Sequence, residues 1–214
     1  MTDQYGHAEI SRMLNGAVNQ IRQNHEMLSR LDAAVGDGDH GTTILRAMEA
    51  VAKVASQPPA TDLKEFFKKV GWDVMSCDGG STGPLLGAFF IGIGETCTGK
   101  RALTPTEWVA ALVSGVNKLH KQSHANIGDK TMMDAFLPAL AVLEAADLSQ
   151  GVQPLLAKAA QAAAAGAEAT RGMKARFGRA RNLGDRVVGH PDPGAVSVSL
   201  ILKGLSEATS HDLV

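Results

Sequence analysis

Apolar residues recur at intervals of three and four positions along most of the chain, the spacing of one face of an α-helix. The first such stretch, Ile10 to Leu31, predicts a helix of several turns. Seven further stretches show the same period or a clear helix start: about 42–54, about 62–76, from 84, from 105, about 131–146, about 152–170 and from 192. Strand signals are few, and the best candidate is the short segment 186–188. The predicted fold class is therefore all-α, a bundle of eight antiparallel amphipathic helices.

The order of the helices predicts which loops lie together. Short loops favour antiparallel neighbours, so the loops after helices one, three, five and seven share one end of the bundle. Those four loops contain glycines, acidic residues and a long basic stretch, at 36–41, 78–83, 126–131 and 172–192. The loops after helices two, four and six read as ordinary turns. One end of the bundle is thus predicted to hold a functional site.

Composition narrows the class of protein without identifying it. The 214 residues fit a single domain, 1–214, with 44% hydrophobic and 20% charged residues, as in soluble globular proteins. A formal net charge of −1 gives no electrostatic case for binding nucleic acid or an anionic membrane. The longest apolar run, 84–94, is too short to span a bilayer.

Other residue types support the same picture. The N-terminus shows no secretory signal, so a cytoplasmic location is expected. Cys77 and Cys97 have no zinc-type spacing and are expected to be buried, reduced thiols. Trp72 and Trp108 fall at helical positions and are assigned to the core.

Three aspartates lie within eight residues, at Asp32, Asp37 and Asp39, and no Lys or Arg lies between Arg30 and Arg46. Like charges this close repel, so a cation is expected to join them. Mg²⁺ suits carboxylate oxygens and keeps positions free for phosphates. The alternative is a solvated Asp-Gly turn before a helix.

Two further loops predict anion binding. The run Gly79–Pro84 places glycines and hydroxyls at a helix start, where free N–H groups attract phosphates, although a plain helix start is the alternative. His40 could donate to a phosphate oxygen, and Thr42 and Thr43 offer hydroxyls that otherwise act as caps.

The segment of about 171–191 carries Arg171, Lys174, Arg176, Arg179, Arg181 and Arg186 against a single acidic residue, Asp185. It is interpreted as a basic flap over a nucleotide's phosphates, because Arg forks match phosphate oxygens; a solvated loop is the alternative. The chain has neither a P-loop nor a Rossmann glycine motif.

Taken in order, these motifs resemble the nucleotide-binding L subunit of dihydroxyacetone kinase. The matching runs are Gly36–Gly41, Gly79–Leu85, Gly128–Met132, Leu183–Arg186 and Gly189–Ala195. The resemblance implies a helical barrel with the nucleotide, ADP or ATP, at one end. It implies that Asp32, Asp37 and Asp39 hold two Mg²⁺ ions.

The resemblance also implies roles for the other site residues. Phosphates are contacted by His40, Gly41, Thr42, Thr43, Ser81 and Thr82. Gly128 and Met132 border the base, although Met132 taken alone reads as a core residue. Arg179 and the turn Asp192–Pro193–Gly194 close over the nucleotide, with Arg179 and His40 as the catalytic candidates.

The implied activity is a kinase that transfers a phosphoryl group to dihydroxyacetone, or a similar short ketose, held by a separate K subunit. Some relatives consume ATP; others keep ADP and have it rephosphorylated by a phosphotransferase-system M subunit. The alternatives are an erythrulose-type ketose kinase subunit, an ADP-loaded sensor that docks on a transcriptional regulator, and a metal-dependent hydrolase.

Overall fold

The computed structural model describes residues 4–209, and helices dominate them. Eight α-helices run through this part of the chain: α1 (His7–Val35), α2 (His40–Ala55), α3 (Leu63–Met75), α4 (Thr82–Glu95), α5 (Pro105–Ser123), α6 (Met133–Glu144), α7 (Val152–Ala169) and α8 (Pro193–Thr209). The predicted number of helices and the all-α class are confirmed.

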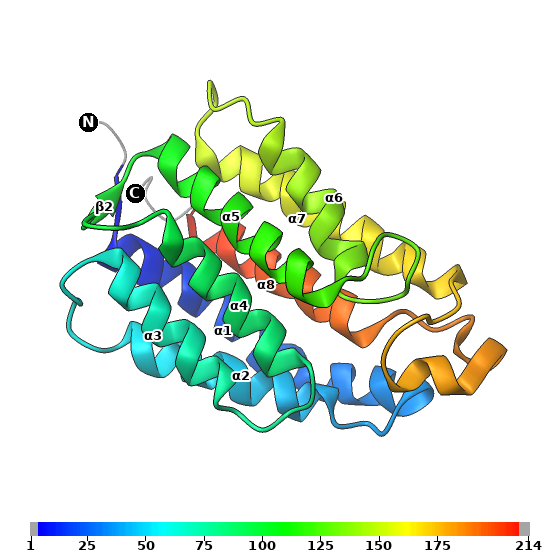
Figure 1. Cartoon of the computed structure of the whole chain (residues 1–214). Coiled ribbons are helices and arrows are strands. Elements are labelled where there is room, and N and C mark those ends of the chain that lie inside the picture. Colours follow the sequence, from blue (N-terminus) through cyan, green and yellow to red (C-terminus); the bar gives the residue numbers. More distant parts are fainter. Residues whose placement is uncertain (1–3, 210–214) are drawn as a thin grey trace.

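The helices form a closed bundle. Consecutive helices pack side by side, and α8 packs against α1, so the last helix closes the ring on the first (Figure 1). Gly16 on α1 and Gly204 on α8 make that contact close, because a Cβ on Gly204 would collide with the carbonyl oxygen of Gly16. None of the helices between residues 4 and 209 has the length and hydropathy to cross a membrane.

The interior is apolar, and aromatic rings fill the end where the chain begins. Trp108 is 1% exposed and stacks with Phe67 at 6.1 Å between ring centroids and with Tyr5 at 6.2 Å. Tyr5 belongs to β1 (Tyr5–Gly6), which pairs antiparallel with β2 (Ala102–Leu103). The helical period gave no signal for these two-residue strands.

Three sequence-based assignments are wrong. Residues Arg179–Val187 form 3₁₀ turns with a kink at Gly184, so 186–188 is not a strand. Trp72 is 56% exposed, because it lies two positions from Val70 and Val74 and therefore on the opposite face of α3. Cys97 is buried as expected, whereas Cys77 follows the end of α3 and is only half-buried.

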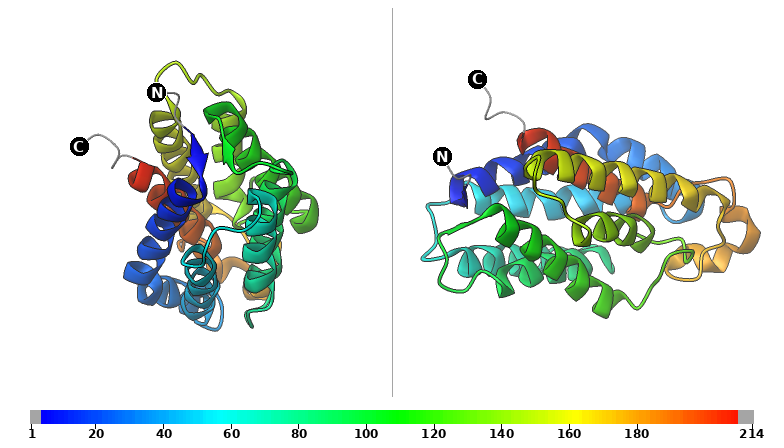
Figure 2. Two further views of the ribbon diagram at one scale, coloured as in Figure 1. Left: turned by 90° about the vertical axis from the view of Figure 1, so that its left-hand side faces the viewer. Right: turned by 90° about the horizontal axis from the view of Figure 1, so that it is seen from above.

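The bundle is elongated, and its two ends differ. The start of α1 and the end of α8 lie at one end, which we call the far end (Figure 2). The segment that contains Arg179–Val187 projects from the other end, which we call the site end. The loops after α1, α3, α5 and α7 all reach the site end, as the alternation of helices predicted.

Candidate nucleotide and metal site

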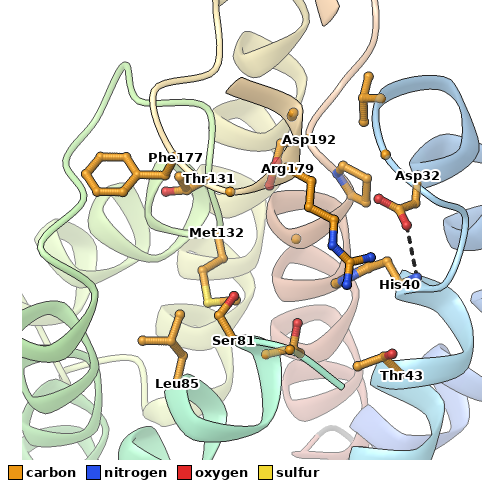
Figure 3. Close-up of a pocket in the computed structure, with 18 of the residues that line it drawn as sticks. Asp32, His40, Thr43, Ser81, Leu85, Thr131, Met132, Phe177, Arg179 and Asp192 are labelled. Atoms are coloured by element: carbon orange, nitrogen blue, oxygen red, sulfur yellow. Dashed lines mark hydrogen bonds between the residues drawn. The ribbon is translucent and has the colours of Figure 1, made fainter. Parts of the chain in front are cut away.

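A cavity of about 400 Å³ opens at the site end. Its walls come from the loop after α1, the start of α4, the loop between α5 and α6, the segment 177–180 and the start of α8. Segments far apart in the sequence therefore meet here only because the helices alternate in direction. The cavity has two unlike sides: Leu85, Met132 and Phe177 lie on one, and Asp32, His40 and Thr43 lie on the other (Figure 3).

The three predicted aspartates come together on the polar side. One carboxylate oxygen from each of Asp32, Asp37 and Asp39 lies within 4.8 Å of the others. The guanidinium of Arg179 is paired with Asp37 and lies 3.4 Å from Asp39. The positive charge of Arg179 thus lies against these carboxylates. Their all-oxygen donor set also fits Mg²⁺.

The start of α2 fixes residues 32–39, which carry the three aspartates and which we call the acidic loop. The backbone N–H of His40 donates to Asp32 Oδ2 at 3.1 Å, which sets the direction of that carboxylate (Figure 3). The His40 ring lies 3.2 Å from Ser197 Oγ on α8. Burial lowers the pKa of His40, against the opposing effects of the Asp32 charge and a hydrogen bond with the Pro193 carbonyl. The ring is therefore neutral near neutral pH and can donate one hydrogen bond.

The loop before α4 faces the acidic loop across the cavity. Gly79, Gly80, Ser81 and Thr82 all line the cavity. A Cβ on Gly79 would collide with the Thr43 side chain, so only glycine lets this loop approach the first turn of α2 so closely. The N-cap side chains of α4 and α2, Ser81 and Asp39, make no capping hydrogen bond, and at the start of α2 only the His40 N–H has a side-chain acceptor among the described residues, Asp32. Both helix starts therefore have N–H groups free to meet an anion.

The loop between α5 and α6 forms the base of the apolar side. Met132 is 9% exposed and lines the cavity, so it is both a core residue and a wall of the site. Buried Asp134 accepts from the N–H of Gly128 at 2.6 Å and of Thr131 at 2.8 Å, which fixes the loop.

The basic segment 171–191, which we call the flap, folds against this loop. The Arg176 N–H donates to the Asp129 carbonyl at 3.1 Å, and its guanidinium lies 3.3 Å from the Asp129 carboxylate. Lys174 pairs with Asp185 at 2.6 Å within the flap. Because of these contacts, Arg179 lies above the acidic loop.

The turn at the start of α8 completes the wall. Asp192, Pro193 and Gly194 line the cavity, and Asp192 Oδ2 accepts from the Ala195 N–H at 2.8 Å, which caps α8. Burial raises the pKa of Asp192 to about 7, because the hydrogen bond from Ala195 and the charge of Lys130 compensate only in part. This carboxyl group is thus poised between its two protonation states near neutral pH.

Most of the predicted site residues line the cavity, and three do not. Gly41 packs its backbone against His25 and Ser29 of α1, Thr42 is exposed, and the Gly128 N–H points to Asp134. The residues that the sequence-based prediction did not assign to the site are Val35, Gly36, Gly79, Gly80, Leu85, Ser123, Ala125, Lys130, Thr131, Met133, Phe177, Gly178 and Ala180. The loop alternation already pointed to most of these segments, but not to the apolar side chains among them.

Known proteins are similar to this chain in sequence and fold. The family model described as DAK2 domain matches residues 34–207. The chain is 34% identical to the PEP-dependent dihydroxyacetone kinase 2, ADP-binding subunit DhaL, of Listeria innocua, over 88% of this chain and 90% of that subunit. It is 32% identical to the L-erythrulose 1-kinase of Mycolicibacterium smegmatis, over 94% of this chain and 36% of that kinase.

A solved structure agrees with these relatives. The dihydroxyacetone kinase from C. freundii, in complex with AMP-PNP and Mg²⁺, superimposes with a TM-score of 0.72 at 30% identity. The match covers 97% of this chain and 35% of that one, so the chain spans about a third of the kinase. The chain therefore belongs to the DAK2 domain family, which includes the ADP-binding DhaL subunits of dihydroxyacetone kinases.

Proposed function

We propose that this chain is the nucleotide-binding subunit of a dihydroxyacetone kinase, in which it carries a phosphoryl group to a ketose held by a K subunit. The observation that supports this most directly is the division of one cavity into a side with three carboxylates and two open helix starts and a side with apolar side chains. A nucleotide has the same two halves, a charged polyphosphate and a flat base. The similarity to an ADP-binding subunit points the same way.

Different residues bind the metal ions, the phosphates and the base. Asp32, Asp37 and Asp39 would hold two Mg²⁺ ions, which neutralise phosphate charge when bound. The N–H groups at the starts of α2 and α4 and the hydroxyls of Thr43, Ser81 and Thr82 bind phosphate oxygens. Met132, Leu85 and Phe177 pack against the base.

Two side chains act nearest the reacting group. Arg179 is held beside the carboxylates, where its fork can contact a phosphoryl oxygen and stabilise charge during transfer. The neutral His40 ring can donate a hydrogen bond to a phosphoryl oxygen, because burial lowers its pKa and leaves the ring uncharged. Catalysis on this chain is positioning and charge stabilisation, with no covalent enzyme group.

The phosphoryl donor is proposed to be a phosphotransferase-system M subunit that rephosphorylates retained ADP. The PEP-dependent Listeria innocua relative supports this choice, while the L-erythrulose 1-kinase relative makes consumed ATP and a different ketose the second candidate. A sensor that docks ADP-loaded on a transcriptional regulator would use the same site without turnover.

Reconstitution tests these assignments. Native mass spectrometry of the purified chain is expected to show retained ADP and two magnesium ions. The chain is then combined with a K subunit and dihydroxyacetone or erythrulose, with either ATP or PEP and the phosphotransferase components. Formation of the phosphoketose only with the relay supports the proposal, and formation only with ATP favours the second candidate. No phosphoketose in any combination refutes a kinase role.

A further inference from the structure

Lys130 is an unusual residue that the binding site does not explain. It is 2% exposed, although lysine is rarely fully buried unless it is paired. Its φ of 60° lies in the left-handed region, where a lysine backbone is strained. Such a conformation persists only when the surroundings fix it, and here the two hydrogen bonds that Asp134 accepts from Gly128 and Thr131 do so.

The buried ammonium group joins the two ends of the flap. Lys130 Nζ donates to the Thr170 carbonyl at 2.6 Å and to the His190 carbonyl at 2.5 Å. These two residues are 20 positions apart in sequence and lie where the flap leaves α7 and where it returns to α8. We call residues 170–171 and 189–192 the stem of the flap.

Other hydrogen bonds hold the stem together around this contact. The Gly189 N–H donates to the Arg171 carbonyl at 2.8 Å, and the Asp192 N–H donates to Thr170 Oγ1 at 2.7 Å. Arg171 Nη1 also donates to the Gly189 carbonyl at 2.9 Å. These bonds link the stem to itself, whereas Lys130 links it to the loop between α5 and α6.

The rest of the flap is held less firmly. Arg176 reaches buried Asp129 through its backbone N–H and a side chain that is 74% exposed, and Arg179 reaches the acidic loop from a side chain that is 62% exposed. Exposed ion pairs contribute little to stability. Besides the Arg176 contact with Asp129, the position of Arg179 over the acidic loop therefore depends on the stem.

We propose that Lys130 is a positioning residue that clasps the stem of the flap and so places Arg179 over the phosphate side of the cavity. The Asp192 and Asp134 charges near its ammonium group help to keep this buried cation charged, although burial lowers its pKa. Only the action of Arg179 on the nucleotide rests on the proposed function of the chain. The clasp itself can be tested without any nucleotide.

Limited proteolysis of the full chain tests the clasp. Lys130→Met keeps the length of the side chain and removes both hydrogen bonds, so trypsin is expected to cut after Lys174, Arg176 and Arg179 about tenfold faster. Cleavage after Lys68 and Lys69 on α3 reports global unfolding and is expected to be unchanged. Lys121→Met, at an exposed position near the end of α5, is the matched control and is expected to behave as the wild type.

The outcome separates a local clasp from a general packing role. Equal acceleration at the flap and at α3, or no acceleration at the flap, overturns the proposal. If Lys130→Met does not fold, Lys130→Gln, whose amide can still donate, is used for the same comparison. Its flap is expected to be cut faster than the flap of the wild type and more slowly than a fully released flap.

A double-mutant cycle tests whether the clasp acts through Arg179. Lys130→Met is expected to weaken Mg-ADP binding about fivefold to tenfold in the wild-type background, and not to weaken it further when combined with Arg179→Met. Additive losses overturn the positioning role. Absence of Mg-ADP binding by the wild type would refute the proposed function, while the protease comparison would still decide whether Lys130 clasps the flap.

Discussion

The two ends of the bundle begin their helices in different ways. At the far end, Asp62 accepts from the Glu65 N–H at 2.9 Å to cap α3, and Thr104 and Glu107 form a reciprocal capping box on α5. At the site end, the N-cap residues of α2 and α4, Asp39 and Ser81, make no capping hydrogen bond, although Asp32 accepts from the His40 N–H. Polar side chains at the far end thus accept hydrogen bonds from the first N–H groups of α3 and α5. At the site end, N–H groups in the first turns of α2 and α4 remain free for a ligand.

The contrast applies to particular helices. Helix α7 begins at the far end at Gly151 without a side-chain cap, and α8 begins at the site end with Asp192 as its cap. The two open helix starts that matter are those of α2 and α4, because Thr43, Ser81 and Thr82 beside them line the cavity. Substitutions at the two ends are therefore expected to affect binding and stability separately.

The largest effect is expected from the acidic loop. Asp37→Ala removes a proposed metal ligand and is expected to lower Mg-ADP affinity by about 100-fold or more, measured by calorimetry. The free energy of unfolding of the nucleotide-free protein should fall little, because the substitution also relieves repulsion among the carboxylates. Asp147→Ala, in the loop before α7 at the far end, is the control. Equal affinities of Asp37→Ala and the wild type would contradict the metal role.

The next effect depends on pH. The folded state raises the pKa of Asp192 from its ordinary value of 3.8 to about 7. Between these values the unfolded chain releases a proton that the folded chain keeps, so stability falls as the pH rises from about 4 to about 7. The loss is expected to be about 1–3 kcal/mol, because partial exposure to the cavity limits it.

Asp192→Asn isolates this contribution. The amide oxygen can still cap α8 but cannot ionise, so the variant is expected to lose the decline between pH 4 and pH 7. Chemical denaturation of the nucleotide-free protein at several pH values measures the difference. Parallel stability profiles for the variant and the wild type would show that Asp192 does not titrate in this range.

Much of the fold followed from the sequence because the helices obey one period. The residues that line α1 and α3 on their inner faces, such as Ile10, Leu28, Phe67 and Val70, are all buried. The same period misplaced Trp72, since a bulky apolar side chain was taken as core without regard to its angle around the helix. Strand β1 consists of two residues, too few to show any period.

Those parts of the site that are formed by residues close together in the sequence could be predicted. The acidic loop and the Gly79–Thr82 turn are contiguous motifs, and the alternation of helices brings them to one end. Lys130 could not be assigned from the sequence, because its role depends on carbonyl groups 40 and 60 residues away. Gly41 is a different case: it lies inside a site motif but does not line the cavity, and its missing side chain serves the packing of α2 on α1.

Removal of the capping box at the far end is expected to have a smaller effect, on stability and not on binding at the site. Thr104→Ala removes the hydroxyl that accepts from the Glu107 N–H, so the free energy of unfolding is expected to fall by about 1 kcal/mol. Mg-ADP affinity is expected to stay within error of the wild type. Thr104→Ser keeps the hydroxyl and serves as the control. A parallel loss of affinity would mean that the two ends are energetically coupled.

Ser81→Ala is the converse test at the site end and is expected to have the smallest effect. The Ser81 hydroxyl caps no helix in the structure, so its loss is expected to change the free energy of unfolding by less than about 0.5 kcal/mol. It lines the cavity beside the open start of α4, so Mg-ADP affinity is expected to fall about threefold to fivefold, the effect of one hydrogen bond to a phosphate oxygen. Ser81→Thr keeps the hydroxyl and should retain most of that affinity. If Ser81→Ala instead destabilised the nucleotide-free protein and bound Mg-ADP normally, the hydroxyl would be serving the helix, and the difference between the two ends of the bundle would not extend to α4.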